Sequence, residues 1–359
     1  MELANKRYYP PGRYPEGWYL VEIARNLPKG GLLQKEWMGR QIVAWRDADG
    51  EICVSEAYCP HLGGHLGPDG GGCVRSGRLV CPFHGFEYDV TGWCVATPNA
   101  PPPRTARLNV YETREVNGLI LAWWSPVGRE PQWELPEWPD REWHRLHYGS
   151  VRLRGHPQET AENSVDIAHF RYVHGYAAVE QVGDVHVDGA YLRNSFVFRR
   201  NVKLLGVPVL TDVAATTHVW GLGYSFVEFH ERVSGLKLRQ WILSTAVDDT
   251  HIRLLVALQI KRWEPGQKWL ATLLLRCLPA SWLTRFFVSR VKHDVRQDVA
   301  IWENKRYQPL PILSRSDGEI MTYRKYCEQF YPDAEESRAR VRSLKPAPIH
   351  AARGANLGA

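Results

Sequence analysis

The sequence predicts an α+β protein with two domains, a β-rich domain over residues 1–125 and a mixed helix and strand domain over residues 141–335. Three observations support this prediction. A chain of 359 residues is long enough for two domains of ordinary size. The 15 Trp, 16 Tyr and 10 Phe residues supply apolar surface for a large packed core. Short apolar runs dominate the first part, whereas strand-like and helix-like patterns both occur in the second.

Short strands account for the first domain. Trp18–Ile23, Arg40–Trp45 and Gly118–Trp124 are apolar runs of strand length. Asp47-Ala48-Asp49-Gly50 is a turn signal that precedes a further strand-like run. Residues 126–140 are rich in proline and polar residues, which predicts a linker.

The second domain contains strand-like runs over residues 185–262 and helical patterns around 158–174 and 267–306. Residues 269–291 are strongly apolar but are interrupted by three arginines and a proline, which argues against a membrane-spanning helix. They are expected to form either amphipathic helices that touch a membrane or a lipophilic substrate's entry route, or a helix packed on the core. Residues 336–359 are basic and lack an apolar pattern, which predicts a disordered tail.

Composition excludes several classes of protein. The net charge of +6 is mild and dispersed, so we do not expect a nucleic-acid partner. Five cysteines outside the motifs below are scattered and indicate buried free thiols rather than a disulfide framework: Cys53, Cys73, Cys94, Cys277 and Cys327. The first 20 residues contain no apolar stretch of the kind found in signal peptides. We therefore expect a cytoplasmic protein, with peripheral membrane contact as an option.

Two mixed Cys/His motifs are the most informative feature of the chain. Cys59-Pro60-His61 and Cys81-Pro82-Phe83-His84 each offer one thiolate and one imidazole. This is the ligand set of a Rieske [2Fe–2S] cluster, in which two cysteines hold one iron and two histidines the other. A structural zinc site also uses two cysteines and two histidines, but zinc fingers usually pair Cys with Cys and His with His along the chain. The spacing therefore favours the cluster and predicts a protein that handles single electrons.

A second group of metal ligands follows in the helical pattern near residue 165. His169 and His174, with a carboxylate, would form the facial triad of a non-haem Fe(II) site. Residues five apart do not share one face of a regular helix, so the helix must bulge or end between them, and Gly175 offers an exit. Asp166 lies three residues before His169 and is either a ligand or an acceptor that orients His169. Asp294 and Asp298 are further candidates for the third ligand.

These motifs resemble those of the α subunits of Rieske non-haem iron oxygenases, over about residues 10 to 335. In that family a Rieske domain precedes a helix-grip (START-like) catalytic domain with an antiparallel sheet. The resemblance implies that the residues of the two Cys/His motifs hold the cluster. It also implies that the family's Asn-x-x-Asp-x-x-His-x₄-His motif falls on the following residues: Asn163, Asp166, His169 and His174.

The resemblance implies roles for two aspartates as well. Asp298, which follows Gln297, matches the third iron ligand. Asp166 matches an aspartate that links an iron-ligand histidine to a cluster-ligand histidine of the adjacent subunit. Asp166 itself would therefore not be an iron ligand. This arrangement implies a head-to-tail homotrimer in which the electron passes from His84 through Asp166 to His169.

Within the family the chain is most similar to 3-ketosteroid 9α-hydroxylase oxygenase components and Rieske-type cholesterol 7-desaturases. The residues that carry this likeness are 163–176 and the segments QDVAIWENKRY and YRKYCEQFY. The resemblance implies O₂-dependent hydroxylation or desaturation of a large apolar substrate, a steroid or sterol. The sequence has no Gly-x-Gly-x-x-Gly site and no plant-type ferredoxin cysteines, so a ferredoxin or a separate reductase is expected to deliver electrons from NAD(P)H.

Two alternatives remain at this point. One is a Rieske electron carrier like that of cytochrome bc complexes. Those proteins have two additional cysteines that form a disulfide, whereas this chain has Gly64 and Phe83 there. A carrier would also have no use for the second group of ligands. The other alternative is an oxygenase that demethylates, hydroxylates or cyclises an aromatic or other natural product.

Overall fold

The structure is a computed structural model that describes residues 14–139, 141–204, 207–232, 234–262, 279–314 and 317–332. The predicted tail over 336–359 and the first part of the apolar segment 269–291 lie outside these residues.

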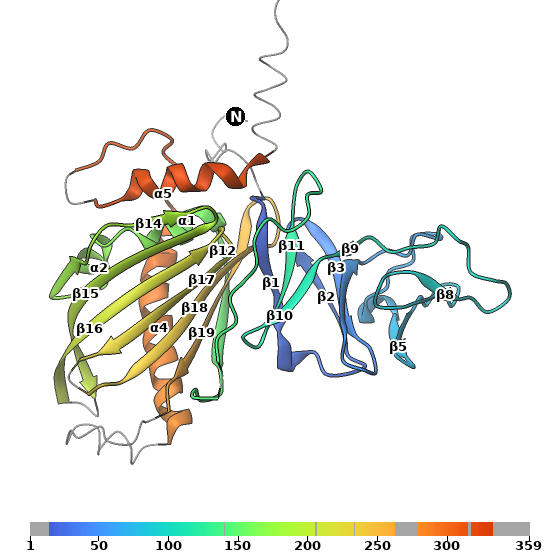
Figure 1. Cartoon of the computed structure of the whole chain (residues 1–359), viewed down its shortest axis with the longest axis horizontal. Coiled ribbons are helices and arrows are strands. Elements are labelled where there is room, and N and C mark those ends of the chain that lie inside the picture. The colour runs from blue at the N-terminus through green and yellow to red at the C-terminus, as the bar shows by residue number, and fades with distance from the viewer. Residues whose placement is uncertain are drawn as a thin grey trace, which may run out of the picture.

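Three small sheets build the N-terminal part of the molecule (Figure 1). Their strand orders are β1-β11-β10, β2-β3-β4-β9 and β5-β6-β7-β8, and every pair is antiparallel. The strands are β1 (Gly17–Ile23), β2 (Leu32–Trp37), β3 (Arg40–Arg46), β4 (Ile52–Glu56), β5 (Cys73–Arg75), β6 (Arg78–Val80), β7 (Glu87–Tyr88), β8 (Cys94–Ala96), β9 (Val110–Tyr111), β10 (Thr113–Val116) and β11 (Leu119–Trp124). The three strands predicted from the sequence correspond to β1, β3 and β11 and are confirmed.

The sheet β1-β11-β10 joins the two halves of the chain. Side chains alternate between the two faces of a strand. Trp18 and Leu121 pack on one face against aromatic residues of the large sheet. Tyr19 and Ile120 pack on the opposite face against the core of sheet β2-β3-β4-β9. Every residue of β11 is buried, which explains its continuous apolar sequence.

An eight-stranded antiparallel sheet forms the second half, with the order β12-β19-β18-β17-β16-β15-β13 and β14 paired with β15. Its strands are β12 (His147–Arg154), β13 (Ala178–Gln181), β14 (His186–Asp188), β15 (Tyr191–Leu204), β16 (Val207–Trp220), β17 (Tyr224–Glu231), β18 (Lys237–Ala246) and β19 (His251–Ile260). With the helices below, this confirms the predicted α+β class.

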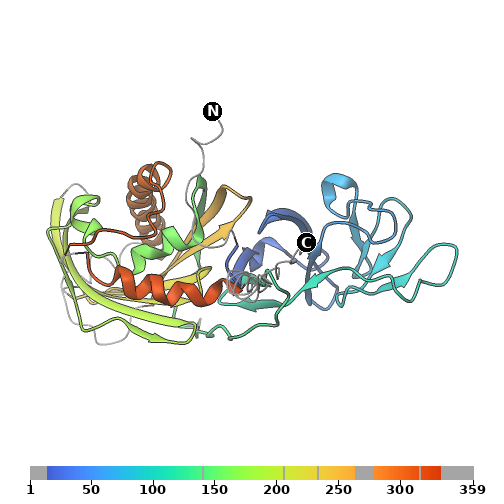
Figure 2. The same ribbon diagram turned by 90° about the horizontal axis from the view of Figure 1, so that it is seen from above.

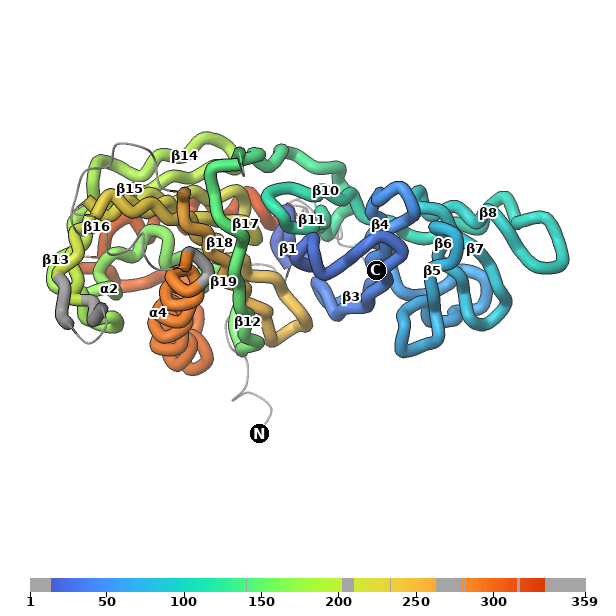
Figure 3. Tube along the Cα trace, turned by 90° about the horizontal axis from the view of Figure 1, so that it is seen from below, coloured from blue at the N-terminus to red at the C-terminus, as the bar shows by residue number. Residues whose placement is uncertain are grey.

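Helices cover one face and one end of this sheet. They are α1 (Pro157–Ala161), α2 (His169–Tyr172), α4 (Ala280–Trp302) and α5 (Ile320–Cys327). Among the described residues, 3₁₀ turns lie beside these helices over Glu162–Ser164 and Glu328–Phe330, and in the N-terminal part over Ala24–Asn26 and Pro68–Gly70. The sheet curves around α4 (Figure 3), and α5 lies across the sheet's end (Figure 1).

The helix predicted around 267–306 is observed as α4 over the residues that are described. Its Leu283 and Val288 are buried against Leu238 and Leu258 of the sheet, so this part of the apolar segment 269–291 packs on the core. Among the described helices, none is both long enough and apolar enough to cross a bilayer.

The molecule is elongated, and the two predicted metal centres lie far apart along it (Figure 2). The small sheet β5-β6-β7-β8, whose strands flank the second Cys/His motif, forms one end. The helices α2 and α4 lie at the other end, within the curve of the large sheet.

Candidate functional site

Two loops of the same design carry the Cys/His motifs. In the first loop the Gly63 N–H donates to the Cys59 carbonyl at 2.9 Å, and in the second the Gly85 N–H donates to the Cys81 carbonyl at 3.0 Å. Both glycines have positive φ angles, +73° and +67°, which glycine adopts at little cost. Each loop therefore forms a tight turn that places its cysteine and its histidine on the same side of the loop.

The four side chains divide into a buried and an exposed pair. Cys59 and Cys81 are 3% and 2% exposed, whereas His61 and His84 lie at the surface with ring centroids 4.7 Å apart. Two buried thiols behind two exposed imidazoles fit a [2Fe–2S] cluster whose histidine side faces outward.

Two neighbours of these side chains were not anticipated from the sequence. The Tyr88 hydroxyl lies 3.0 Å from Cys59 Sγ, where it can hydrogen-bond a cluster ligand and affect the potential. The Phe86 ring stacks on His61 with a centroid distance of 4.4 Å. Their spacing in the sequence carries no signal for these roles.

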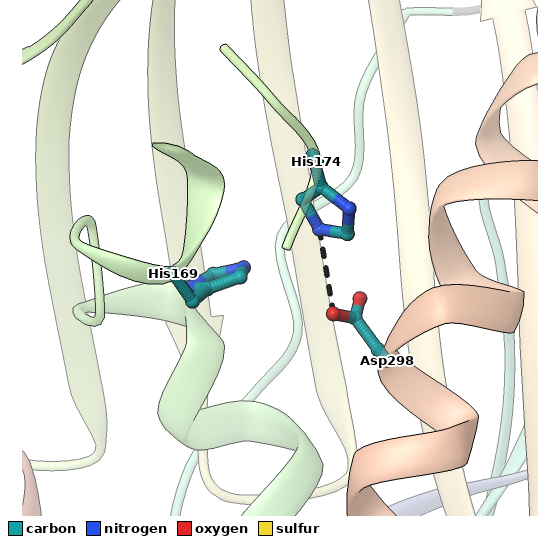
Figure 4. Close-up of side chains that lie close together, drawn as sticks. All are labelled: His169, His174 and Asp298. Atoms are coloured by element: carbon teal, nitrogen blue, oxygen red, sulfur yellow. Dashed lines mark ion pairs between the residues drawn. The ribbon is translucent and has the colours of Figure 1, made fainter. Parts of the chain in front are cut away.

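The second group of ligands lies where α2 ends. α2 begins at His169 and ends at Tyr172, so His174 falls on the exit turn, and Gly175 has a φ of +66°. The predicted break between the two histidines is confirmed. The two side chains thereby face the same space, which Asp298 enters from α4 (Figure 4). One ligand atom from each of the three residues lies within 4.8 Å of the others, and His174 Nε2 is 3.3 Å from Asp298 Oδ1.

Hydrogen bonds fix the orientation of both rings. His174 Nδ1 lies 2.9 Å from Gln297 Oε1, an atom that only accepts, so Nδ1 donates and Nε2 is left facing Asp298. His169 Nδ1 lies 2.5 Å from the Asp166 carbonyl oxygen, which leaves its Nε2 on the cavity side beside Asn163 at 3.5 Å. Such bonds to the second ring nitrogen are usual for metal-binding histidines.

Asp166 lies beside the triad but is outside the group of three. Its carboxylate accepts a hydrogen bond of 3.2 Å from the His169 backbone N–H and is 3.7 Å from His169 Nδ1. Burial acts to raise the pKa of Asp166, but hydrogen bonds and the charge interaction with His169 outweigh it and hold the pKa below its usual value. Asp166 is thus ionised at neutral pH and partly accessible, with 32% of its side chain exposed.

Asp294 and Asp298 have different partners, although both line the same cavity. Asp298 joins the two histidines, whereas Asp294 Oδ2 forms an ion pair of 2.8 Å with Arg200. Arg200 also donates to the Tyr176 hydroxyl at 2.8 Å. No local pattern indicates this second polar group, because Arg200 and Asp294 are 94 residues apart in the sequence.

A cavity with a volume of about 460 Å³ lies between the sheet and α4 and opens on the triad. Its walls are mainly apolar, and the residues that line it from the strands include Phe196, Phe198, Val213, Val227, Leu238 and Leu258. A cavity of this size and polarity is typical of a binding site for an apolar small molecule.

Two family models match the chain. The Rieske [2Fe-2S] domain matches residues 17–112, and the 3-ketosteroid 9α-hydroxylase C-terminal domain matches residues 122–331. Among curated proteins, cholesterol 7-desaturase of Ciona intestinalis is 28% identical, with 90% of this chain and 70% of that protein covered. An oxygenase component of 3-ketosteroid-9-alpha-monooxygenase from Rhodococcus rhodochrous is 27% identical, with 91% of this chain and 86% of that protein covered.

Solved structures with the same fold include dicamba monooxygenase bound to dicamba, with a TM-score of 0.67, 16% identity, and 90% of this chain and 98% of that chain covered. NdmA of Pseudomonas putida CBB5 with caffeine has a TM-score of 0.64, 18% identity, and 94% and 97% coverage. The order of domains, the antiparallel catalytic sheet and the two matched models agree with one another. This chain is an oxidoreductase that belongs to the Rieske oxygenases with a 3-ketosteroid 9α-hydroxylase C-terminal domain.

Proposed function

We propose that the chain is the oxygenase component of a system that hydroxylates or desaturates a steroid or sterol. The observation that carries this proposal is the apolar cavity that opens on His169, His174 and Asp298. Relatives that cover most of the chain are named for action on cholesterol and on 3-ketosteroids. A rigid polycyclic hydrocarbon suits walls made mainly of aromatic and branched side chains.

His169, His174 and Asp298 would hold a ferrous ion. Two imidazoles and a carboxylate on one side of the ion are the donor set of non-haem oxygenases and leave positions for O₂ and substrate. When bound, this iron supplies the activation of O₂ that removal of a hydrogen from carbon requires. The chain's own residues orient the rings, exclude water with apolar walls and hold the substrate beside the triad.

Cys59, His61, Cys81 and His84 would hold the cluster that feeds this site. The cluster loops and the triad lie at opposite ends of the molecule (Figure 2), which favours electron transfer between subunits over transfer within one chain. In the proposed homotrimer, Asp166 accepts a hydrogen bond from His84 of the partner subunit while its own contacts hold His169. The exposed position of His84 and the partial exposure of Asp166 support this route.

A separate ferredoxin or reductase would deliver electrons from NAD(P)H to the cluster. The sequence carries no dinucleotide-binding glycine motif and no second set of cluster cysteines.

The test is turnover of a panel of sterols and 3-ketosteroids by the purified protein with a surrogate ferredoxin reductase, NADH and O₂, followed by mass spectrometry. A product that gains one oxygen, or loses two hydrogens, is expected and distinguishes hydroxylation from desaturation. The Asp298→Ala variant, with its cluster reduced equally well, is the control and is expected to give no product. Absence of any product from the wild type, with the cluster shown to be reduced, would contradict the steroid assignment and favour an aromatic substrate.

A further inference from the structure

Arg290 has an unusual environment in the cavity wall. It lies on α4 and lines the cavity, and its Nε atom is buried without a hydrogen-bond partner in the described part of the chain. No ion pair forms with it among the residues that the structure describes. A guanidinium stays protonated at any pH a protein experiences. Because buried donors in folded proteins are rarely left unpaired, this donor is available to a group that enters the cavity from outside the chain.

The other charged groups of the cavity already have partners. Arg200 is neutralised by Asp294 at 2.8 Å. The Glu231 carboxylate accepts hydrogen bonds from the backbone N–H and the hydroxyl of Ser234. Of the two arginines in the described lining, Arg290 is therefore the one whose charge has no acidic partner.

The distance along α4 between Arg290 and the triad sets the length of the ligand that could reach both. Arg290, Asp294 and Asp298 are spaced four residues apart and line the cavity from one face of α4. Eight residues of helix separate the backbones of Arg290 and Asp298 by about 12 Å. The wall around Arg290 is apolar, because Phe287 and Val291 of α4 pack with the leucines of the sheet.

We propose that Arg290 binds a carboxylate at one end of an elongated apolar substrate and so determines which carbon lies at the triad. The planar guanidinium can form two parallel hydrogen bonds with a carboxylate, and a water-poor wall strengthens them. The inference rests on the proposed function for the place of reaction, but the binding of an acid by Arg290 can be measured separately.

The experiment compares cholanic acid, a steroid whose side chain ends in a carboxylate, with its neutral methyl ester. Dissociation constants are measured by quenching of intrinsic tryptophan fluorescence. We expect the wild type to bind the acid at least about tenfold more tightly than the ester, the magnitude of one hydrogen bond to a charged group. Arg290→Gln is expected to lose this preference, whereas Arg290→Lys is expected to keep part of it.

Arg296→Gln is the matched control, because Arg296 is exposed on the same helix and lies outside the cavity lining. It is expected to keep the preference of the wild type. Equal affinity of the wild type for the two ligands, binding of neither, or a preference that survives in Arg290→Gln would overturn the proposal. The wild-type comparison stands even if a variant fails to fold.

Turnover assays on the same samples separate this proposal from the proposed function. Preferential binding of the acid without any oxidised steroid would support the role of Arg290 and contradict the steroid oxygenase. Oxidised products without preference for the acid would support the oxygenase and overturn the role of Arg290.

Discussion

At the scale of single residues, the central choice lies between two aspartates of α4. Asp298 faces the two histidines and Asp294 faces Arg200. Asp298→Ala is expected to lose the mononuclear iron while the visible spectrum of the cluster stays unchanged. Asp294→Asn is expected to keep the iron but to lose about 3 kcal/mol of stability, because Arg200 remains buried without its partner. Iron content, acid-labile sulfide and thermal unfolding measure both effects; unchanged iron in Asp298→Ala would point to Asp294.

The second prediction concerns the role of Asp166 in electron transfer. Its carboxylate holds His169 by hydrogen bonding but does not join the three ligands. Asp166→Ala is expected to keep both metals and to abolish turnover, because it removes the proposed link between His169 and the partner subunit. Metal analysis and the steroid assay check this together, and retained turnover would exclude the linking role.

His174 makes iron binding depend on pH. Burial acts to lower the pKa of His174, but hydrogen bonds to Asp298 and Gln297 outweigh it and raise the pKa above its usual value of 6.5. In the iron-free protein the protonated His174 ring therefore stabilises the fold at a pH below the pKa that His174 has in the unfolded chain. This contribution is lost as the pH rises through the pKa that His174 has in the folded protein. Iron needs the neutral ring, so its affinity is expected to rise with pH across this range.

Anaerobic calorimetric titration of Fe(II) into the iron-free protein, in two buffers with different ionisation enthalpies, checks the His174 prediction. Release of protons on binding near pH 6.5, diminishing at higher pH, is expected. Binding without proton release at pH 6.5 would contradict it.

The residues with fixed spacing could be predicted from the sequence, and those brought together by the fold could not. Cys59, His61, Cys81 and His84 lie in two short motifs, and His169 and His174 lie in one. The Arg200–Asp294 pair and the unpaired Nε of Arg290 depend on how β15 and α4 face each other across the cavity. Neither feature has a local pattern that sequence analysis can detect.

At the scale of elements, the exit from α2 determines where His174 points. Gly175 adopts a φ of +66° with open space around its missing side chain, so only its backbone conformation opposes substitution. Gly175→Ala is expected to cost about 1 to 2 kcal/mol and to lower the iron content, because a left-handed conformation is unfavourable for alanine. Gly155→Ala is the matched control, since its new side chain would meet only ordinary contacts, with the nearest atom at 3.5 Å.

Thermal unfolding and iron analysis of the two glycine variants measure this effect. Equal behaviour of Gly175→Ala and Gly155→Ala would show that the exit turn is not needed to place His174.

Elements with a strong apolar pattern matched their predictions best. The strands β1, β3 and β11 were anticipated because their sequences contain short apolar runs, which are buried in the structure. The helical pattern around 158–174 is instead divided into α1, a 3₁₀ turn and α2. Tertiary contacts decide this division, because the Asn194 side chain donates to the Ser164 carbonyl and α1 begins at a buried His156 cap.

At the scale of the whole molecule, the separation of the two centres along one chain is the basis of the proposed electron path between subunits. The two Cys/His loops lie at one end and the triad at the other. Exposed apolar residues accompany both, with Phe83 next to His84 and Tyr172 between the two triad histidines. We expect these surfaces to meet in a head-to-tail trimer, in which each cluster serves the triad of the partner subunit.

Complementation between two inactive variants tests this claim most directly. Cys81→Ser would lack the cluster and Asp298→Ala would lack the mononuclear iron, so each alone is expected to give no product from the substrate that the wild type oxidises. When the two are coexpressed and purified together, mixed trimers bring an intact cluster beside an intact triad, and a substantial fraction of wild-type turnover is expected to return. If the mixed preparation contains both chains in one assembly and still gives no product, electron transfer between subunits is contradicted.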